Sequence, residues 1–327
     1  MYCIGIDVGS VSTDFVVMDE DYKIVHQIYL KTKGNPIEAI KEGMTQLRRR
    51  FYKEQIKAVG TTGSGRSLAA AIVGADIVKN EITTHGVAAS TLNPKVRTIL
   101  EIGGQDSKII LLRDGVISDF AMNTVCAAGT GSFLDRQAER LGLKVDELGQ
   151  YALKGKNPVR IAGRCAVFAE SDIIHKQQLG CKIEDIIAGM SEALVRNYLS
   201  NVAKGKELEE TVFFQGGVAS NEGIVSAFEK ELGCKVIVPE YHKVMGAFGA
   251  AILAKDLIER ENKKTSFVGF EAGNYNVITE SFECSDCSNH CEVVLLKSGS
   301  RQIGAFSDRC GKYQIEKIND SNDSLES

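Results

Sequence analysis

Short apolar runs, typical of buried strands, alternate along the chain with longer segments in which apolar residues recur at helical spacing. Residues 56–59 and 211–214 form two such runs, and each leads into a glycine-rich segment. The pattern from Pro36 to about residue 52 predicts an amphipathic helix with proline in its first turn, where the missing N–H costs little. A last helix is predicted from about residue 245 to 258. This alternation predicts an α/β fold.

An internal repeat is the most informative pattern in the sequence. An apolar strand that carries one acidic residue, a tight glycine turn and a second apolar strand occur near the N-terminus and recur 94 positions later. The repeat pairs Asp7 with Glu101 and Gly9 with Gly103. Because the acid, the glycine and the following strand all match in register, we interpret the two segments as a duplicated unit rather than as two unrelated hairpins.

The glycine turns suit the phosphates of a nucleotide, which need backbone N–H donors at close range and small hydroxyl side chains. Glycine turns are common, so no single one is informative, but three in this order predict a nucleotide site. The candidate contacts are Gly9, Ser10, Val11, Ser12 and Thr13 in the first turn, Gly103 and Gly104 in the second, and Gly216, Gly217 and Val218 at a strand-to-helix junction. The last three would let the adenosine approach the backbone closely.

The candidate catalytic residues are three acids and an amide at these turns. Asp7 and Glu101 would hold Mg²⁺ through water or position the attacking water molecule. Gln105 and Asp106 follow in the second turn and complete the candidate set. The sequence thus predicts that two hairpins, one from each lobe of the molecule, clasp a polyphosphate.

Composition and charge narrow the class of protein. The 327 residues exceed what one hydrophobic core usually serves, so we expect two lobes and an appendage. With 43% hydrophobic and 25% charged residues, the chain has the composition of a soluble globular enzyme. A net charge of −4 argues against a nucleic-acid partner bound through a basic face. The sequence has no apolar run long enough to cross a membrane and no signal-peptide pattern, so we expect a cytoplasmic protein without a membrane partner.

Nine cysteines in such a chain are better interpreted as metal ligands, reactive thiols or buried residues than as a disulfide framework. Cys126 and Cys165 each precede a segment with the pattern of a helix, and a thiolate at a helix N-terminus meets free N–H donors. Four cysteines cluster near the C-terminus, whereas Cys3, Cys181 and Cys234 have no such context. The two groups of cysteines therefore predict two separate functions.

Several segments resemble those of one enzyme family. They are residues 102–106, 123–134 around Cys126, 165–171 around Cys165, and 246–251. These segments are similar to those of the activator ATPases of 2-hydroxyacyl-CoA dehydratases and the ATPase subunits of benzoyl-CoA reductases. That family is a branch of the acetate and sugar kinase, actin and heat-shock chaperone superfamily. The resemblance covers roughly residues 1–260 and implies a duplicated actin-like (ribonuclease H-like) two-lobed ATPase fold.

The resemblance also implies an ATP-dependent electron donor. In that family two subunits share one 4Fe–4S cluster, each giving two cysteines, which here would be Cys126 and Cys165 of a homodimer. ATP bound with Mg²⁺ at the glycine turns would drive a low-potential electron into a partner: a dehydratase, a benzoyl-CoA-type reductase or a double-cubane-cluster protein. A ferredoxin or flavodoxin is the expected electron donor. The sequence departs from the family at Glu101, where many relatives have aspartate, and at Lys243, where some have glutamine near the adenosine.

The C-terminal cysteines predict a separate metal site. Cys284, Cys287 and Cys291 are followed after 18 residues by Cys310, with a predicted β-hairpin in between. Four thiolates on a hairpin suit a structural zinc ion, because the metal replaces a core too small to stand alone. The same thiolates suit a second 4Fe–4S cluster that feeds the first. The sequence leaves both alternatives open.

We expect three domains. Residues 1–95, completed by the helix 244–260, form the first actin-like lobe, residues 96–243 form the second lobe with the cluster cysteines, and residues 261–327 form a linker and a cysteine-rich β appendage. Two other functions are compatible with the same fold: a small-molecule kinase of the sugar type, and a non-redox ATP-dependent scaffold. The scaffold predicts no cluster. The kinase requires a sugar pocket with a catalytic acid, for which the sequence has no signature.

Overall fold

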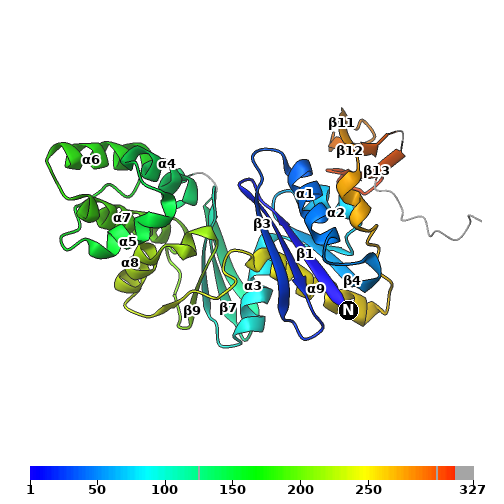
Figure 1. Cartoon of the computed structure of the whole chain (residues 1–327), viewed down its shortest axis with the longest axis horizontal. Helices are drawn as coiled ribbons and strands as arrows, with labels where there is room; N and C mark the ends of the chain where they lie inside the picture. The colour runs from blue at the N-terminus through cyan, green and yellow to red at the C-terminus, as the bar shows by residue number, and fades with distance from the viewer. Residues whose placement is uncertain (124–125, 300, 314–327) are drawn as a thin grey trace, which may run out of the picture. The chain divides into compact units, whose positions relative to one another are not determined.

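The computed structural model describes residues 1–123, 126–299 and 301–313 and divides the chain into two compact units. Unit 1 contains residues 1–80 and the chain from residue 246 onward, and unit 2 contains residues 81–245. Each unit is built on its own five-stranded sheet (Figure 1). Thr124 and Val125 of the predicted cluster motif, and the last part of the predicted appendage, lie outside the described residues.

The sheet of unit 1 has the strand order β3-β2-β1-β4-β5. The strands are β1 (Tyr2–Val8), β2 (Ser12–Met18), β3 (Ile24–Lys31), β4 (Ile56–Thr62) and β5 (Ile77–Val78). The first three form an antiparallel meander, whereas β4 runs parallel to β1, and β5 runs parallel to β4. Parallel neighbours need crossover connections, and these connections contain the helices.

The helices of unit 1 cover both faces of its sheet. They are α1 (Pro36–Arg48), α2 (Arg66–Val73) and α9 (Met245–Glu261), with a short 3₁₀ turn, η1, at Lys53–Gln55. The side chain of Asn35 accepts a hydrogen bond from the backbone N–H of Glu38 and so caps the start of α1. Ile4, Ile6 and other alternate strand residues form the core with α1 and α2, and α9 lies against Gly5 on the opposite face.

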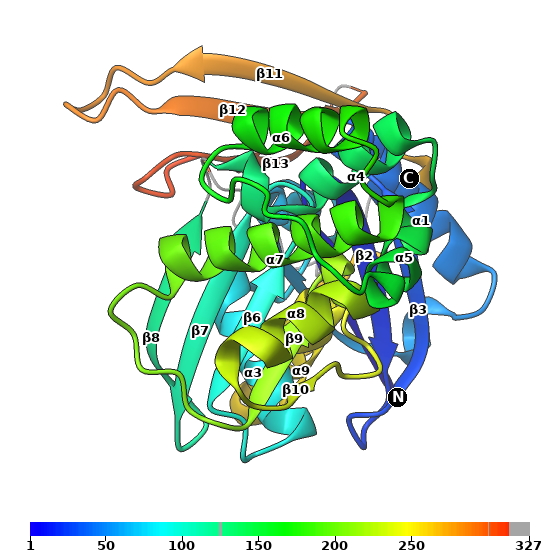
Figure 2. The same cartoon turned by 90° about the vertical axis from the view of Figure 1, so that its left-hand side faces the viewer.

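Unit 2 has the same arrangement, with the strand order β8-β7-β6-β9-β10. The strands are β6 (Thr98–Ile102), β7 (Ser107–Arg113), β8 (Val116–Asn123), β9 (Val212–Gln215) and β10 (Val236–Ile237). The helices are α3 (Glu81–Leu92), α4 (Gly131–Leu141), α5 (Leu148–Lys154), α6 (Ala166–Gln178), α7 (Ile183–Val202) and α8 (Glu222–Leu232), with the 3₁₀ turns η2 (Ala127–Gly129), η3 (Val145–Glu147) and η4 (Gly217–Ser220). Figure 2 shows α7 and α8 lying across the strands of this sheet.

The two sheets match strand for strand, which confirms the predicted duplication. β6, β7 and β8 form an antiparallel meander, and β9 runs parallel to β6 as β4 does to β1. The turns match as well: the N–H of Gly9 donates to the carbonyl of Ser12 over 2.8 Å, and the N–H of Gly103 donates to the carbonyl of Asp106 over 3.1 Å. The same turn thus closes the first hairpin of each unit.

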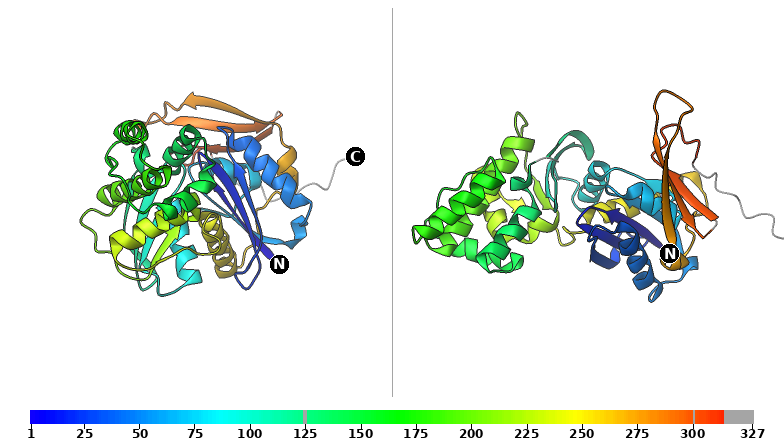
Figure 3. Two further views of the ribbon diagram at one scale, coloured as in Figure 1. Left: turned by 60° about the vertical axis from the view of Figure 1, so that its left-hand side comes forward. Right: turned by 90° about the horizontal axis from the view of Figure 1, so that it is seen from above.

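A three-stranded antiparallel sheet follows α9 in unit 1. Its strands are β11 (Val277–Glu283), β12 (Glu292–Ser298) and β13 (Arg301–Phe306), with β12 in the centre, and the 3₁₀ turn η5 (Phe270–Asn274) precedes them. The side chain of Leu296 enters the core of unit 1. The right-hand view in Figure 3 shows these strands, in orange, as a separate layer. The predicted C-terminal β-hairpin is the β12–β13 pair.

Two predicted boundaries were wrong by a few residues. The first helix ends at Arg48 rather than near residue 52, because the ring of Phe51 turns back and packs edge-on against Tyr2, 5.3 Å between ring centroids. The last helix continues to Glu261, three residues beyond the predicted end near residue 258, so Glu261, the first residue of the predicted linker, is helical. Among the described residues, no helix is long and apolar enough to cross a membrane.

Candidate functional site

The first glycine turn, Gly9 to Ser12, is held by a threonine from a neighbouring strand end. The hydroxyl of Thr32 donates to the carbonyl of Gly9 over 2.9 Å and lies 2.9 Å from the hydroxyl of Thr13. Thr13 is fully buried, so its side chain supports the turn from the interior of the unit, whereas Ser10 is exposed at the tip of the turn. The sequence analysis missed Thr32, because nothing in its local pattern marks it as a partner of a turn 20 residues earlier.

Two carboxyl groups face each other across the first hairpin. Asp7 on β1 pairs with Asp14 on β2. Asp14 is buried, and one of its carboxylate oxygens accepts from the hydroxyl of Ser12 over 3.2 Å. Its other oxygen has no hydrogen-bond partner among the described residues. Burial, reinforced by the neighbouring Asp7, raises the pKa of Asp14 well above its ordinary value.

The second hairpin has a lysine where the first has Asp14. Lys108 pairs with Glu101 across β6 and β7 and is 2% exposed. Its Nζ lies 3.0 Å from Glu101, 2.9 Å from Asp106 and 2.7 Å from Glu81 on α3. Burial opposes the charge of Lys108, but these three carboxylates raise its pKa above its ordinary value. The structure therefore brings the predicted Glu101 and Asp106 together around a buried cation.

Glu101 holds its proton more tightly than an ordinary glutamate. Burial raises the pKa of Glu101 to about 7, and Asp106 and Glu81 add to the effect of burial against the opposing charge of Lys108. Four acids and bases thus share one buried site in unit 2. A carboxyl with a pKa near neutrality is suited to accept a proton from an attacking water molecule.

A buried histidine extends this cluster. Nδ1 of His85 on α3 lies 2.7 Å from Oε1 of Gln215, which ends β9 directly before Gly216. Burial and the nearby Lys108 lower the pKa of His85, so the ring is neutral. The sequence analysis missed Glu81, His85 and Gln215. The available signal for Gln215 was its position before the glycines, whereas the two α3 residues reach the cluster only through tertiary packing.

Matching glycines lie beside the two strand acids. Gly216 has φ 89°, and a Cβ on it would lie 2.3 Å from the carbonyl of Ile102 and 2.7 Å from Oε1 of Glu101. Gly63 at the end of β4 has φ 90° and the same relation to Asp7, with a Cβ 2.5 Å from Oδ1. Only glycine fits either position. Gly63 was not among the predicted site residues, although its place after β4 repeats that of Gly216 after β9.

The remaining predicted nucleotide contacts in unit 2 lie close to Gly216. Gly217 and Val218 form η4, in which Gly217 is exposed and Val218 is buried. The N–H of Gly216 donates to the carbonyl of His242 over 2.9 Å, so the turn that carries the exposed Lys243 lies next to this glycine segment. Gln105 is exposed at the tip of the second turn.

The second glycine turn is hydrogen-bonded directly to the start of α4. The N–H of Gly131 donates to the carbonyl of Gly103 over 2.9 Å. The N–H of Ser132 donates to the carbonyl of Gly104 over 2.8 Å, and the Ser132 hydroxyl donates to the same oxygen over 2.5 Å. Because α4 follows Cys126 by only a few residues, the phosphate-type turn and the cysteine segment are mechanically connected within unit 2.

The two predicted cluster cysteines each begin a helical segment. Cys165 caps α6, as predicted, but Cys126 caps the single turn η2, and α4 itself begins five residues later. The Sγ of Cys126 lies 3.8 Å from the carbonyl of Arg164, directly before Cys165, and both thiols are half-buried. Two accessible thiols, one of them at the N-terminus of a helix, are of the type that serves as ligands of an anionic iron–sulfur cluster.

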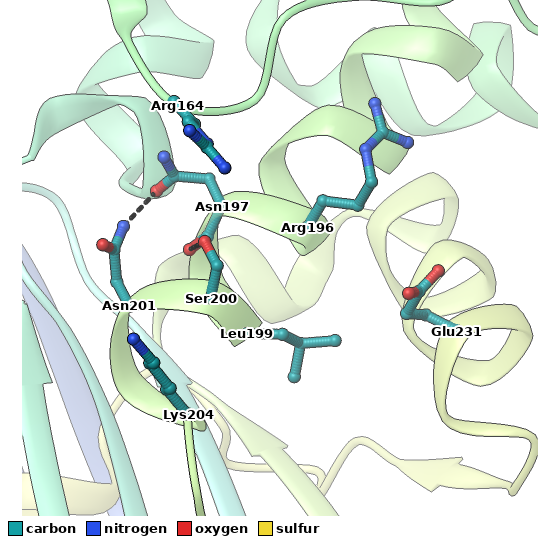
Figure 4. A pocket seen from close by; sticks show the side chains of 8 residues that line it. All are labelled: Arg164, Arg196, Asn197, Leu199, Ser200, Asn201, Lys204 and Glu231. Atoms are coloured by element: carbon teal, nitrogen blue, oxygen red, sulfur yellow. Dashed lines mark hydrogen bonds between the residues drawn. The ribbon is translucent and has the colours of Figure 1, made fainter.

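A cavity of about 690 Å³ lies beside α7 (Figure 4), and two of its lining residues, Asn197 and Arg164, also contact Cys126. Its lining residues are Arg164, Arg196, Asn197, Leu199, Ser200, Asn201, Lys204 and Glu231. The amide nitrogen of Asn197 lies 3.5 Å from the Sγ of Cys126, and its oxygen accepts from Asn201 over 3.0 Å. The cavity wall therefore supplies an amide donor to Cys126, and Arg164, Arg196 and Lys204 give the cavity cationic side chains.

The C-terminal cysteines are arranged differently. Cys284 is buried, Cys291 is half-buried, and Cys287 and Cys310 are exposed. The N–H of Cys284 donates to the carbonyl of Cys291 over 2.8 Å. In the part of the chain that the structure describes, no group of three or more histidine, cysteine, aspartate or glutamate side chains stands in position to hold a metal ion.

Comparison with known proteins identifies the family. Residues 4–254 match the BadF/BadG/BcrA/BcrD ATPase family. The chain belongs to this family. The match covers both five-stranded sheets and most of α9, and it ends before the sheet β11–β13. The family resemblance inferred from the two cysteine motifs and the glycine turns is therefore confirmed.

Relatives of this family member include dehydratase activators. The 2-hydroxyisocaproyl-CoA dehydratase activator of Clostridioides difficile is 36% identical over 270 residues, which span 81% of this chain and 98% of the relative. The (R)-2-hydroxyglutaryl-CoA dehydratase activating ATPase of Acidaminococcus fermentans is 34% identical over 257 residues, which span 78% and 97%. These matches extend over nearly the whole length of each relative.

A solved structure of such an activator has the same fold. The activator of the 2-hydroxyisocaproyl-CoA dehydratase from Clostridium difficile with bound ADPNP superposes with a TM-score of 0.73 at 34% identity, covering 80% of this chain and 97% of that chain. The predicted two-lobed actin-like α/β fold is thereby confirmed. The β11–β13 sheet is the small C-terminal β appendage that was also predicted.

Proposed function

We propose that this ATPase-family member is an ATP-dependent electron donor, the activating component of a dehydratase or reductase. The observation that carries the proposal is the arrangement in unit 2, where the segments of Cys126 and Cys165 adjoin each other and a glycine turn is hydrogen-bonded to the helix after Cys126. A nucleotide site and a redox site joined by a few hydrogen bonds are what such a donor requires.

ATP with Mg²⁺ is the proposed nucleotide. Support comes from the family and from the relative whose structure holds ADPNP. The backbone N–H groups of the turns after β1 and β6 would contact the phosphates, with Gly216 to Val218 and Lys243 on the nucleoside side. Glu101, with its pKa near 7, would accept a proton from the attacking water, while Asp7 would hold Mg²⁺ through water.

The proposed redox group is one 4Fe–4S cluster shared by two copies of the chain. Such a cluster takes four thiolates, and Cys126 and Cys165 supply two of them, so a homodimer provides the rest. When bound, it supplies one-electron transfer at low potential. The chain's own residues would orient the two thiols, since the backbone N–H of Cys126 donates to Asn123 over 2.9 Å and Asn197 donates to the Cys126 sulfur.

The exposed side chains near these cysteines favour a shared interface. Val167 and Phe168, in the first turn of α6 directly after Cys165, are 68% and 66% exposed. Large apolar groups at this exposure are stabilised when a second surface covers them. A second copy that brings its own Cys126 and Cys165 would cover this turn and complete the ligand set at the same time.

The proposed electron acceptor is a 2-hydroxyacyl-CoA dehydratase, a benzoyl-CoA-type reductase or a double-cubane-cluster protein. Two activating ATPases of dehydratases are among the relatives, which supports the first of these. A ferredoxin or flavodoxin is the proposed donor. Binding of ATP would shift the second turn and, through α4, the segment of Cys126, so that the nucleotide controls when the electron leaves.

Anaerobic purification tests the proposal. We expect a brown dimer with about four iron atoms, a reduced-state electron paramagnetic signal and ATP hydrolysis. Cys126→Ser should abolish the chromophore, whereas the control Cys181→Ser, which alters a half-buried thiol elsewhere in unit 2, should leave it unchanged. If the wild-type protein hydrolyses ATP but is colourless and monomeric, this result would contradict the proposal and favour the sugar-type kinase or the scaffold.

A further inference from the structure

The C-terminal sheet has little core of its own. Within the described part of 277–313, Val293 and Leu296 are the large apolar side chains that are fully buried, and Leu296 packs into the core of unit 1. Six of the seven residues of β11 are exposed. Small sheets of this kind usually depend on a disulfide or a metal ion for their stability. The sheet also lies beyond the family match, which ends at residue 254, so a role for it is independent of the function proposed above.

Three contacts hold the segment of Cys310 against the segment of the other three cysteines. Nη1 of Arg309 donates to Oδ1 of Asn289 over 3.2 Å. Lys312 forms an ion pair with Asp286, and the hydroxyl of Tyr313 donates to the Sγ of Cys284 over 3.6 Å. These contacts lie on both sides of Cys310, so residues 284–291 and 309–313 adjoin although 18 residues separate Cys291 from Cys310.

Hydrogen bonds also close the chain into turns around these cysteines. The N–H of Tyr313 donates to Oδ2 of Asp308 over 2.8 Å and closes a turn around Cys310, while the ring of Tyr313 packs edge-on against Phe282, 5.1 Å between centroids. The hydrogen bond from Cys284 to Cys291 closes a second turn around Cys287. Two turns that each carry cysteines and adjoin each other form the usual frame of a tetrathiolate zinc site.

We propose that Cys284, Cys287, Cys291 and Cys310 together bind one zinc ion that stabilises the β11–β13 sheet. Zinc is favoured because it takes four thiolates in a tetrahedron, and structural zinc replaces the core that this sheet lacks. The thiols have yet to converge: that of Cys284 donates to Asp286 over 3.5 Å. Zinc displaces the thiol protons, so convergence accompanies binding, and the Tyr313 hydroxyl stays as a donor to the Cys284 sulfur.

Metal analysis of the full-length, anaerobically purified protein tests this proposal. We expect about one zinc ion per chain in the wild type, in addition to any iron. Cys287→Ser and Cys310→Ser should each lose it, and because both side chains are exposed, neither change removes core packing. The control Cys234→Ser, at a half-buried thiol of unit 2, should keep the zinc. Alkylation of the four thiols should be slow until a chelator is added.

The possible results of the metal analysis either support the zinc site or overturn it. Zinc that is lost in both exposed-position variants and kept in the control supports the site. Wild-type protein without zinc, zinc retained in Cys287→Ser and Cys310→Ser, or iron held by these cysteines in place of zinc would each overturn the proposal. Because Cys126 and Cys165 are untouched in these variants, the brown colour of the proposed cluster should persist, so a failure here is distinct from a failure of the electron-donor function.

Discussion

Asp14 and Lys108 occupy equivalent positions in the two units and carry opposite charges. Each pairs across its hairpin with a strand acid, Asp7 in unit 1 and Glu101 in unit 2. In unit 2 the positive charge of Lys108 balances the negative charge of the buried Glu101. In unit 1 two carboxyls face each other instead, and burial together with Asp7 raises the pKa of Asp14. The duplication therefore kept the backbone of the turn and changed its charge, which favours unit 1 for the proposed Mg²⁺.

His85 gives the stability of unit 2 a predictable dependence on pH. Burial and then Lys108 lower its pKa, and Glu81 and Asp106 are the charged groups that oppose this shift. The unfolded chain therefore binds a proton below about pH 6.5 that the folded chain does not, so the contribution of His85 to the free energy of unfolding should fall as the pH drops below that value. The loss amounts to about 1.4 kcal/mol for each unit by which the pKa is lowered. Glu101, whose pKa burial raises to about 7, contributes with the opposite sign, so the effect of His85 is measured as the difference between the wild type and a variant at that position.

His85→Asn should flatten this part of the pH profile, because the amide can replace the Nδ1 contact with Gln215 but does not titrate. Urea denaturation followed by circular dichroism measures the effect, since the chain has no tryptophan to report unfolding. His175→Asn, at an exposed position of α6, is the matched control and should keep the wild-type slope. Equal slopes in wild type and His85→Asn would show that the ring is not buried in its neutral form.

At the scale of elements, the sequence predicted the helices and strands whose ends are marked by local sequence signals. The paired hairpins, the start of α4 at Gly131 and the cap of α6 by Cys165 follow from glycines, acids and periodicity, and the structure has them at those residues. It did not predict α7, whose residues 186–191 are buried without interruption. A helix that is buried on most sides lacks an amphipathic stripe, so its hydrophobic pattern does not distinguish it from a buried strand.

The candidate site was predictable only in part, for a related reason. Its glycines and strand acids are local to two turns, but the buried cluster around Lys108 also takes Glu81 and His85 from α3. Those contacts depend on which sheet α3 packs against, and neither residue carries a local signal of that choice. The same holds for Asn197, which reaches Cys126 from the middle of α7.

The attachment of the C-terminal sheet includes, besides the packing of Leu296, a close approach between β13 and α2. A Cβ on Gly304 of β13 would lie 2.4 Å from the Cβ of Ala71 on α2, so a larger residue cannot fit without separating the two elements. Gly304→Val should therefore cost about 1–3 kcal/mol and loosen the sheet from unit 1. Limited proteolysis should then cleave residues 262–276 faster than in the wild type.

The neighbouring residue offers a control for that change. Ala305 lies on the other face of β13, so Ala305→Val adds two of the three carbon atoms that Gly304→Val adds, without meeting α2. We expect it to leave the cleavage rate unchanged. If Gly304→Val resisted the protease as the wild type does, the packing of β13 on α2 would not be what holds the sheet in place.

At the scale of the whole molecule, the proposed function requires that nucleotide binding and hydrolysis affect the cysteines. Within unit 2 the shortest connection is the pair of hydrogen bonds from the start of α4 to the carbonyls of Gly103 and Gly104. A turn that moves with its bound phosphate would carry these carbonyls and the first turn of α4 with it, because packed elements shift as rigid bodies. Cys126 lies just before that helix, so its sulfur would follow.

Ser132→Ala should weaken this coupling, because the Ser132 hydroxyl gives α4 its second bond to Gly104. We expect the rate at which a chelator removes iron to depend on ATP against ADP in the wild type, and this dependence to shrink several-fold in the variant while nucleotide affinity is retained. Ser171→Ala removes a hydroxyl that bonds only within α6 and should change nothing. An undiminished dependence in Ser132→Ala would mean that the nucleotide signal reaches the cysteines by another route.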